Sequence, residues 1–194
     1  MNLLVPAVGK GGDLTDSTAN FAVVKDDHDL VLRRWISIGR PAAELCTLWL
    51  HPDTLPRVMA HFARVEIINH SDARWEVDGP MGKTWRWESR ITEVEPGRLI
   101  AWRALDGADV PNEGQLELTA APGEWGTEIA LTLRFTPPGG KLGKKMTSML
   151  DIFPKEIASK ALHRFKSLAE TGEIPTLYSQ PAGRHAQHKD DKEV

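Results

Sequence analysis

The chain has 194 residues, a length that fits one domain with a sizeable core. Hydrophobic residues make up 41% and charged residues 26%, which is ordinary for a globular protein. The formal net charge of −3 lacks the basic excess of a nucleic-acid-binding surface, so no nucleic-acid partner is expected. A single cysteine, Cys46, excludes an internal disulfide, and its apolar helical surroundings predict a buried thiol.

The first 27 residues show no sustained hydrophobic period and are interpreted as an N-terminal arm, with one short strand around 21–24. The apolar run near the start is too short for a signal peptide and has no basic residues before it. No segment approaches the roughly eighteen apolar residues of a transmembrane candidate. These features predict a cytoplasmic protein and leave open a transient contact with a membrane.

The segment 28–176 is predicted to form one domain, in which a strand at 30–38 is followed by two short helices near 41–50 and 55–61. Six further strands are bounded by turn-rich sequences, at 64–69, 74–78, 83–94, 99–104, 114–120 and 127–135. No connection between these strands is long enough for a crossover helix. The sheet is therefore predicted to be an antiparallel meander.

The stretch GPMGKT at 79–84 contains the Gly-Lys-Thr of a phosphate-binding loop. That loop needs a further glycine at position 77 and a helix after the motif. Val77 stands at that position, and the residues after Thr84 alternate between apolar and polar as in a strand. The motif is therefore predicted to be the tip of a β-hairpin.

The C-terminal part of the domain is predicted to be a long amphipathic helix, because apolar residues recur every three or four positions from Leu142 to Leu168. Pro154 kinks or divides this helix, and Thr171 and Gly172 end it. Laid across the apolar face of the sheet, the helix completes a two-layer α+β fold. Residues 177–194 are polar, show no period and are predicted to form a disordered tail.

Tryptophan is unusually abundant, with seven residues against one tyrosine. Trp75, Trp87 and Trp102 lie in the phase assigned to the concave face of the sheet. One helix cannot fill the concave side of a sheet this large, so the remaining space holds either large side chains or a cavity. An indole suits both interpretations, since it combines a large apolar area with one N–H donor.

Four stretches resemble bacterial proteins of the polyketide cyclase/dehydrase type in the START-like (SRPBCC) superfamily. They are ISIGRPAAELCTLW at 36–49, the segment 75–118, GTEIALTLRFTPPGG at 126–140 and RFKSLAETGEIPT at 164–176. The resemblance covers about residues 30–176 and implies the helix-grip, or Bet v 1-like, fold. In that fold a curved antiparallel sheet of about seven strands wraps a long C-terminal helix. Members bind lipids, sterols, quinones or polyketides between the helix and the sheet.

The resemblance favours a ligand cavity over a filled interior, and the phases of the strands and the helix select its lining. The predicted ligand-binding residues are Arg34, Trp75, Val77, Trp87, Trp102, Leu116, Leu118, Leu131, Leu133, Met146, Met149 and Phe153. We expect a small hydrophobic or amphipathic ligand (a lipid, quinone or polyketide-like molecule) held by burial. Arg34 or an indole N–H would orient it. No cofactor is expected.

Two other functions stay open. A cyclase or dehydrase needs a proton donor or acceptor inside the cavity, and the candidates are Arg34, Arg103, Asp109 and Glu113. None has a partner fixed by spacing, so no catalytic residue is assigned. A protein-interaction module would instead use the arm to extend a sheet edge of its own or a neighbouring chain, as a monomer or a homodimer.

The histidines do not predict a metal site. His51, His61 and His70 are close in sequence, with Asp53 and Glu66 between them. No pair has the helical or tight strand spacing that brings two ligands to one metal ion. They are interpreted as solvated or capping residues.

Overall fold

The computed structural model describes residues 21–26, 29–78, 82–135 and 156–175. Its first elements are β1 Phe21–Asp26, β2 Asp29–Ile38, α1 Ala42–Leu50, α2 Thr54–Met59, β3 Arg64–Ile67 and β4 Asp72–Asp78. The remaining elements are β5 Thr84–Glu95, β6 Leu99–Ala104, β7 Asn112–Ala120, a short 3-10 turn at Pro122–Glu124, β8 Thr127–Phe135 and α4 Glu156–Thr171.

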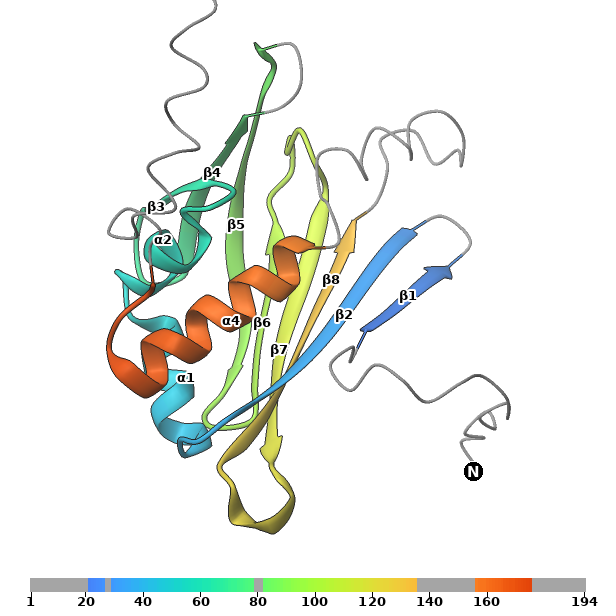
Figure 1. Cartoon of the computed structure of the whole chain (residues 1–194). Helices are drawn as coiled ribbons and strands as arrows, with labels where there is room; N and C mark the ends of the chain where they lie inside the picture. The colour runs from blue at the N-terminus through green and yellow to red at the C-terminus, as the bar shows by residue number, and fades with distance from the viewer. Residues whose placement is uncertain (1–20, 27–28, 79–81, 136–155, 176–194) are drawn as a thin grey trace, which may run out of the picture.

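The strands form one curved sheet in the order β1-β2-β8-β7-β6-β5-β4-β3, in which every neighbouring pair is antiparallel. Helix α4 lies across one face of this sheet, and α1 and α2 follow β2 on the same side (Figure 1). This is the helix-grip arrangement that the sequence resemblance implied. None of the helices in the described part of the chain is long and apolar enough to span a membrane.

The eighth strand, β1, lies within the segment that the sequence analysis assigned to an N-terminal arm. It pairs with β2 from Phe21 opposite Arg34 to Asp26 opposite Asp29. The other side of β2 is already paired with β8, so this edge would otherwise expose a row of backbone donors and acceptors. β1 covers part of that edge and corresponds to the short strand expected around 21–24, so it joins the seven strands that were predicted for the domain.

The GPMGKT stretch connects two paired strands, as predicted. β4 and β5 are antiparallel neighbours, and their register ends at Asp78 opposite Thr84. Because a strand of twelve residues follows the motif, it does not open the helix that a phosphate loop requires.

The centre of the core lies under α4. Phe165 is fully buried and packs edge-on against Trp49 of α1, with ring centroids 4.9 Å apart. Ile100, Leu116 and Ile129 from three different strands belong to the same buried cluster. The predicted part of the C-terminal helix before Glu156, with Met146, Met149, Phe153 and Pro154, lies outside the described residues, as does the tail at 177–194.

The C-terminal end of α4 is fastened to the turn between β2 and α1. The carboxylate of Glu170 accepts a hydrogen bond of 2.9 Å from the backbone N–H of Gly39 and pairs with Lys166. The Gly39 hydrogen bond is the main reason why the pKa of Glu170 lies below its usual value. From the other side, Nε of Arg40 donates to the carbonyl of Ala169. These bonds set the position of α4 along the sheet.

Replacing Phe165 by Ala should therefore lower the free energy of unfolding by about 3–5 kcal/mol, because a large cavity opens beneath α4. Urea denaturation followed by far-UV circular dichroism measures this loss. Lys160→Ala is the control on the exposed side of the same helix and should change stability by less than about 0.5 kcal/mol. Equal effects of the two substitutions would contradict this packing of α4.

Candidate ligand-binding site

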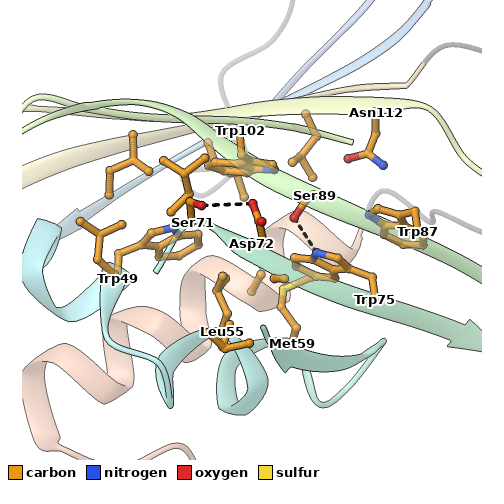
Figure 2. Close-up of a pocket in the computed structure, with 18 of the residues that line it drawn as sticks. Trp49, Leu55, Met59, Ser71, Asp72, Trp75, Trp87, Ser89, Trp102 and Asn112 are labelled. Atoms are coloured by element: carbon orange, nitrogen blue, oxygen red, sulfur yellow. Dashed lines mark hydrogen bonds between the residues drawn. The ribbon is translucent and has the colours of Figure 1, made fainter. Parts of the chain in front are cut away.

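A cavity of about 440 Å³ lies between the concave face of the sheet, α1, α2 and the first turns of α4. Four of the seven tryptophans line it: Trp49, Trp75, Trp87 and Trp102 (Figure 2). Apolar side chains from α2 and α4 complete the helical side, among them Leu55, Met59, Ile157 and Ala161. The volume lies in the range typical of small-molecule pockets, roughly 300–1,000 Å³.

The cavity gathers some of the predicted ligand-binding residues and leaves out others. Trp75, Trp87, Trp102, Leu131 and Leu133 line it. Val77, Leu116 and Leu118 are buried but do not line its described walls. Leu116 and Leu118 belong to the packed cluster that includes α1 and α4, so the helices cover them.

Arg34 lies on the concave side of β2 but does not line the cavity. Its register partner on β8 is Leu131, which lines the cavity itself. Partial burial lowers the pKa of the Arg34 guanidinium, and the nearby carboxylate of Glu156 opposes this shift. An orienting contact from Arg34 to a ligand therefore remains a prediction.

The other three residues considered for catalysis lie outside the cavity. Arg103 and Glu113 are exposed, and Glu113 pairs with Arg134 at 3.2 Å. The carboxylate of Asp109 accepts a hydrogen bond of 2.8 Å from the backbone N–H of Arg86. These contacts give each carboxylate a structural role at the surface.

Trp75 and Trp87 form a stacked pair on one wall of the cavity. They are direct register partners on β4 and β5, with ring centroids 5.7 Å apart and an interplanar angle of 5°. Nε1 of Trp75 donates a hydrogen bond of 2.9 Å to Oγ of buried Ser89. That bond satisfies the indole donor inside an apolar wall and fixes the orientation of the ring.

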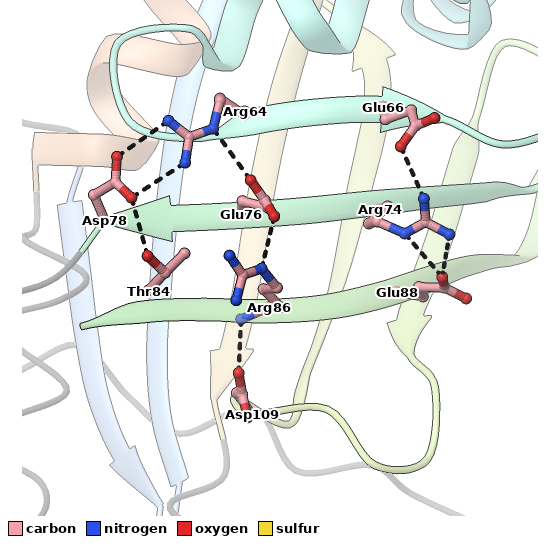
Figure 3. Close-up of polar contacts among 9 residues, drawn as sticks. All are labelled: Arg64, Glu66, Arg74, Glu76, Asp78, Thr84, Arg86, Glu88 and Asp109. Carbon is pink, nitrogen blue, oxygen red and sulfur yellow. Dashed lines mark hydrogen bonds and ion pairs between the residues drawn. The ribbon is translucent and has the colours of Figure 1, made fainter. Parts of the chain in front are cut away.

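The opposite face of these strands carries a ladder of cross-strand ion pairs (Figure 3). The carboxylate of Glu76 pairs with Nε of Arg64 at 3.2 Å and with Nε of Arg86 at 2.6 Å. The guanidinium of Arg74 pairs with the carboxylates of Glu66 and Glu88. Each exposed pair contributes little to stability by itself, because solvent screens it. Their arrangement nevertheless opposes a one-residue slip in register, which would turn the charges inward and the tryptophans outward.

A glycine determines how Trp102 lies in the cavity. Trp102 on β6 pairs with Gly114 on β7, and its indole lies directly over that glycine. A Cβ at position 114 would stand 2.5 Å from Cζ2 of Trp102, far inside contact distance. Only a residue without a side chain lets the indole lie against β7, where it also approaches Trp49 with ring centroids 6.3 Å apart.

Two turns form an exposed rim of the cavity. His51 and Pro52 lie between α1 and α2, and residues 69–72 connect β3 to β4. Asp72 receives hydrogen bonds of 2.7 and 2.9 Å from the guanidinium of Arg90 and a further one from Asn69. These donors hold the pKa of the Asp72 carboxyl well below its usual range.

The rim does not form a metal centre. His51 and His70 both line the cavity, and Nδ1 of His51 accepts a hydrogen bond from the backbone N–H of Asp53. Among the residues that the structure describes, no group of three His, Cys, Asp or Glu side chains is placed to hold a metal ion.

The sequence analysis missed three notable lining residues: Trp49, Ser89 and Asn112. Trp49 lies in the short helix that was predicted near 41–50, which was given no role at the cavity. Ser89 lies on the same face of β5 as Trp87, and Asn112 lies on the same face of β7 as Leu116. For Ser89, a polar residue in an otherwise apolar strand phase was a usable signal. Asn112 precedes the strand that was predicted at 114–120, so no such signal existed for it.

Comparison with known proteins agrees with this geometry. The model of the family described as polyketide cyclase/dehydrase and lipid transport matches residues 38–166. A Deinococcus radiodurans protein of known crystal structure is 34% identical, with a TM-score of 0.57, over 74% of this chain and 99% of that one. A search of curated proteins gave no match.

Two more distant structures share the fold. A Thermus thermophilus protein is 19% identical, with a TM-score of 0.58, over 72% of this chain and 96% of that one. The Zhui aromatase/cyclase from Streptomyces sp. R1128 is also 19% identical, with a TM-score of 0.56, over 76% of this chain and all of that one. The fold is that of the START-like superfamily. Within it, this chain belongs to the polyketide cyclase/dehydrase and lipid transport family.

The close approach of Gly114 and Trp102 yields a test of the cavity. Gly114→Ala should push the indole off β7 into the cavity, lower stability by about 1–3 kcal/mol and weaken binding of the neutral probe Nile red. Fluorescence titration measures the affinity, and Thr119→Ala at an exposed position of the same strand serves as the control. Unchanged stability and affinity in Gly114→Ala would contradict this placement of Trp102.

Asp72 makes the stability of the rim depend on pH. Its folded-state pKa is depressed, so its contribution is fully present above the unfolded value of about 3.9 and is lost as pH falls through the folded pKa. Asp72→Asn should therefore be less stable than the unmodified protein at pH 7, and the difference should shrink below about pH 4. Urea unfolding across this range tests the expectation. A difference that stays constant with pH would show that the carboxylate charge is not responsible.

Proposed function

We propose that this protein binds a small hydrophobic or amphipathic molecule in the cavity between its sheet and its helices. The observation that carries the proposal is the cavity of about 440 Å³ with its tryptophan and aliphatic lining. Each CH₂ group moved from water into such a lining contributes about 0.8 kcal/mol. Burial alone would therefore hold a ligand of modest size, while polar groups on the walls would orient it.

Family membership supports this role in general terms, because the family description includes both cyclase/dehydrase proteins and lipid transport. The Zhui protein is named an aromatase/cyclase, but its 19% identity supports only a common fold. Catalysis would need a cavity group that exchanges protons near neutral pH. Asp72 is kept ionised by Arg90, which makes that carboxyl a poor proton donor.

Native mass spectrometry of the freshly purified protein tests the proposal directly. We expect a mass above that of the chain alone, and solvent extraction should release a discrete apolar or amphipathic compound. Incubation of that compound with the protein, followed by chromatography, would detect turnover and so favour the cyclase/dehydrase alternative. A bare mass, together with no uptake of Nile red, would contradict the proposed binding role.

A pair of matched substitutions tests the place of binding. Trp102→Glu puts an unpaired charge into the cavity wall and should reduce Nile red affinity more than tenfold, since a buried unpaired charge is strongly unfavourable. Trp125→Glu makes the same chemical change at a tryptophan that is 80% exposed and outside the cavity lining, and it should leave the affinity unchanged. Circular dichroism confirms that both variants fold. Equal affinities in the two variants would place the probe elsewhere.

A further inference from the structure

A small group of uncharged polar atoms in the cavity wall indicates which kind of ligand the cavity accepts. This inference rests on the proposed binding function. The group consists of Ser89 on β5, Trp102 on β6 and Asn112 on β7, and all three residues line the cavity. Figure 2 shows the nitrogen edge of the Trp102 indole on the side of Ser89 and Asn112. The strand register is consistent with this arrangement. Trp102 on β6 pairs with Gly114 on β7, which is two residues from Asn112. Ser89 on β5 pairs with Ala104 on β6, which is two residues from Trp102.

Each of these side chains has a defined hydrogen-bonding capacity. Nδ2 of Asn112 donates one of its two hydrogens to the carbonyl of Val110 at 2.8 Å, which leaves Oδ1 to accept and the second N–H to donate. Oγ of Ser89 accepts from Trp75, which leaves its hydroxyl proton to donate. None of the described residues accepts a hydrogen bond from Nε1 of Trp102, which remains a donor beside β7. The group thus offers both donors and an acceptor over a short stretch of the wall.

A hydroxyl group matches this set better than other common polar groups. Its proton can be donated to Oδ1 of Asn112 while its oxygen accepts from Nε1 of Trp102 or from Ser89. An ether or ketone oxygen only accepts, so Oδ1 of Asn112 would lose its contact with water without gaining a donor from the ligand. A carboxylate has the same deficiency and adds a charge that must leave water.

The arginines of β3, β4 and β5 are not available to an anionic ligand in the cavity. The guanidinium groups of Arg64, Arg74 and Arg86 lie on the opposite face of the sheet, paired with carboxylates (Figure 3). The described lining of the cavity contains no lysine or arginine. A carboxylate bound beside Asn112 would therefore have no described counter-ion in the cavity wall.

We propose that the cavity binds an uncharged amphiphile through a hydroxyl group, alcoholic or phenolic, that Asn112, Trp102 and Ser89 recognise together. The apolar remainder of the molecule lies against the tryptophan and aliphatic walls. Ligands of the same shape that carry an ether or a carboxylate in place of the hydroxyl bind more weakly.

Three probes with a common ring test this selection on the unmodified protein: 2-naphthol, 2-methoxynaphthalene and 2-naphthoate at pH 7, each titrated by isothermal calorimetry. We expect 2-naphthol to bind about tenfold more tightly than 2-methoxynaphthalene, and 2-naphthoate to bind the most weakly. Equal affinities, or the tightest binding by the carboxylate, would overturn the hydroxyl assignment while leaving hydrophobic binding intact. Failure of all three probes to bind would overturn the proposed function as well.

Two variants locate the selection at this group. Asn112→Leu removes the acceptor, so the preference for 2-naphthol over the methyl ether should fall to near one. Trp102→Phe removes the donor and should weaken both of these probes about equally, leaving their ratio unchanged. Gln115→Leu, on the other face of the same strand, is the amide-to-leucine control and should keep the tenfold ratio. If the folded Asn112→Leu variant kept the tenfold preference for 2-naphthol over the methyl ether, the assignment of Asn112 as the acceptor would be overturned.

Discussion

The structure depends on the alternation of side chains along β4 and the part of β5 that pairs with it. Trp75 and Trp87 face inward as a cross-strand stack, while Glu76 and Arg86 on the same two strands face outward as an ion pair. A change of register by one residue would bury the ion pair and expose both indoles, so the two faces support the same alignment. The apolar wall of the cavity and the charged outer surface are consequences of one pairing pattern.

The open space itself has a different origin. Helix α4 packs tightly on one part of the sheet through Phe165 and the residues around it, and beyond that contact the described helices leave a cavity against the concave face. Because Gly114 lets the indole of Trp102 lie against β7, the volume stays available to a ligand. A single glycine therefore influences both the stability of the wall and the size of the site.

Family membership and geometry bear on different parts of the functional question. The family description covers proteins that transform polyketides and proteins that carry lipids, and both uses need an enclosed apolar space. The described walls of this cavity add neutral hydrogen-bonding groups at Ser89 and Asn112 and an ionised, fully paired carboxylate at Asp72. Such groups are suited to orienting a ligand.

The sequence by itself determined the elements and their faces, because periods of two and of three to four residues are local properties of the chain. Trp75, Trp87, Trp102, Leu131 and Leu133 could be assigned to the concave side on that basis. The sequence pattern did not distinguish these cavity-lining residues from Leu116 and Leu118, which have the same strand phase but lie under the helices. Only the tertiary structure decided that division, since it depends on where α1 and α4 cross the sheet. The same holds for Ser89, Trp102 and Asn112: strands distant in sequence contribute them, and only strand pairing and the close contact at Gly114 bring their polar atoms to one wall.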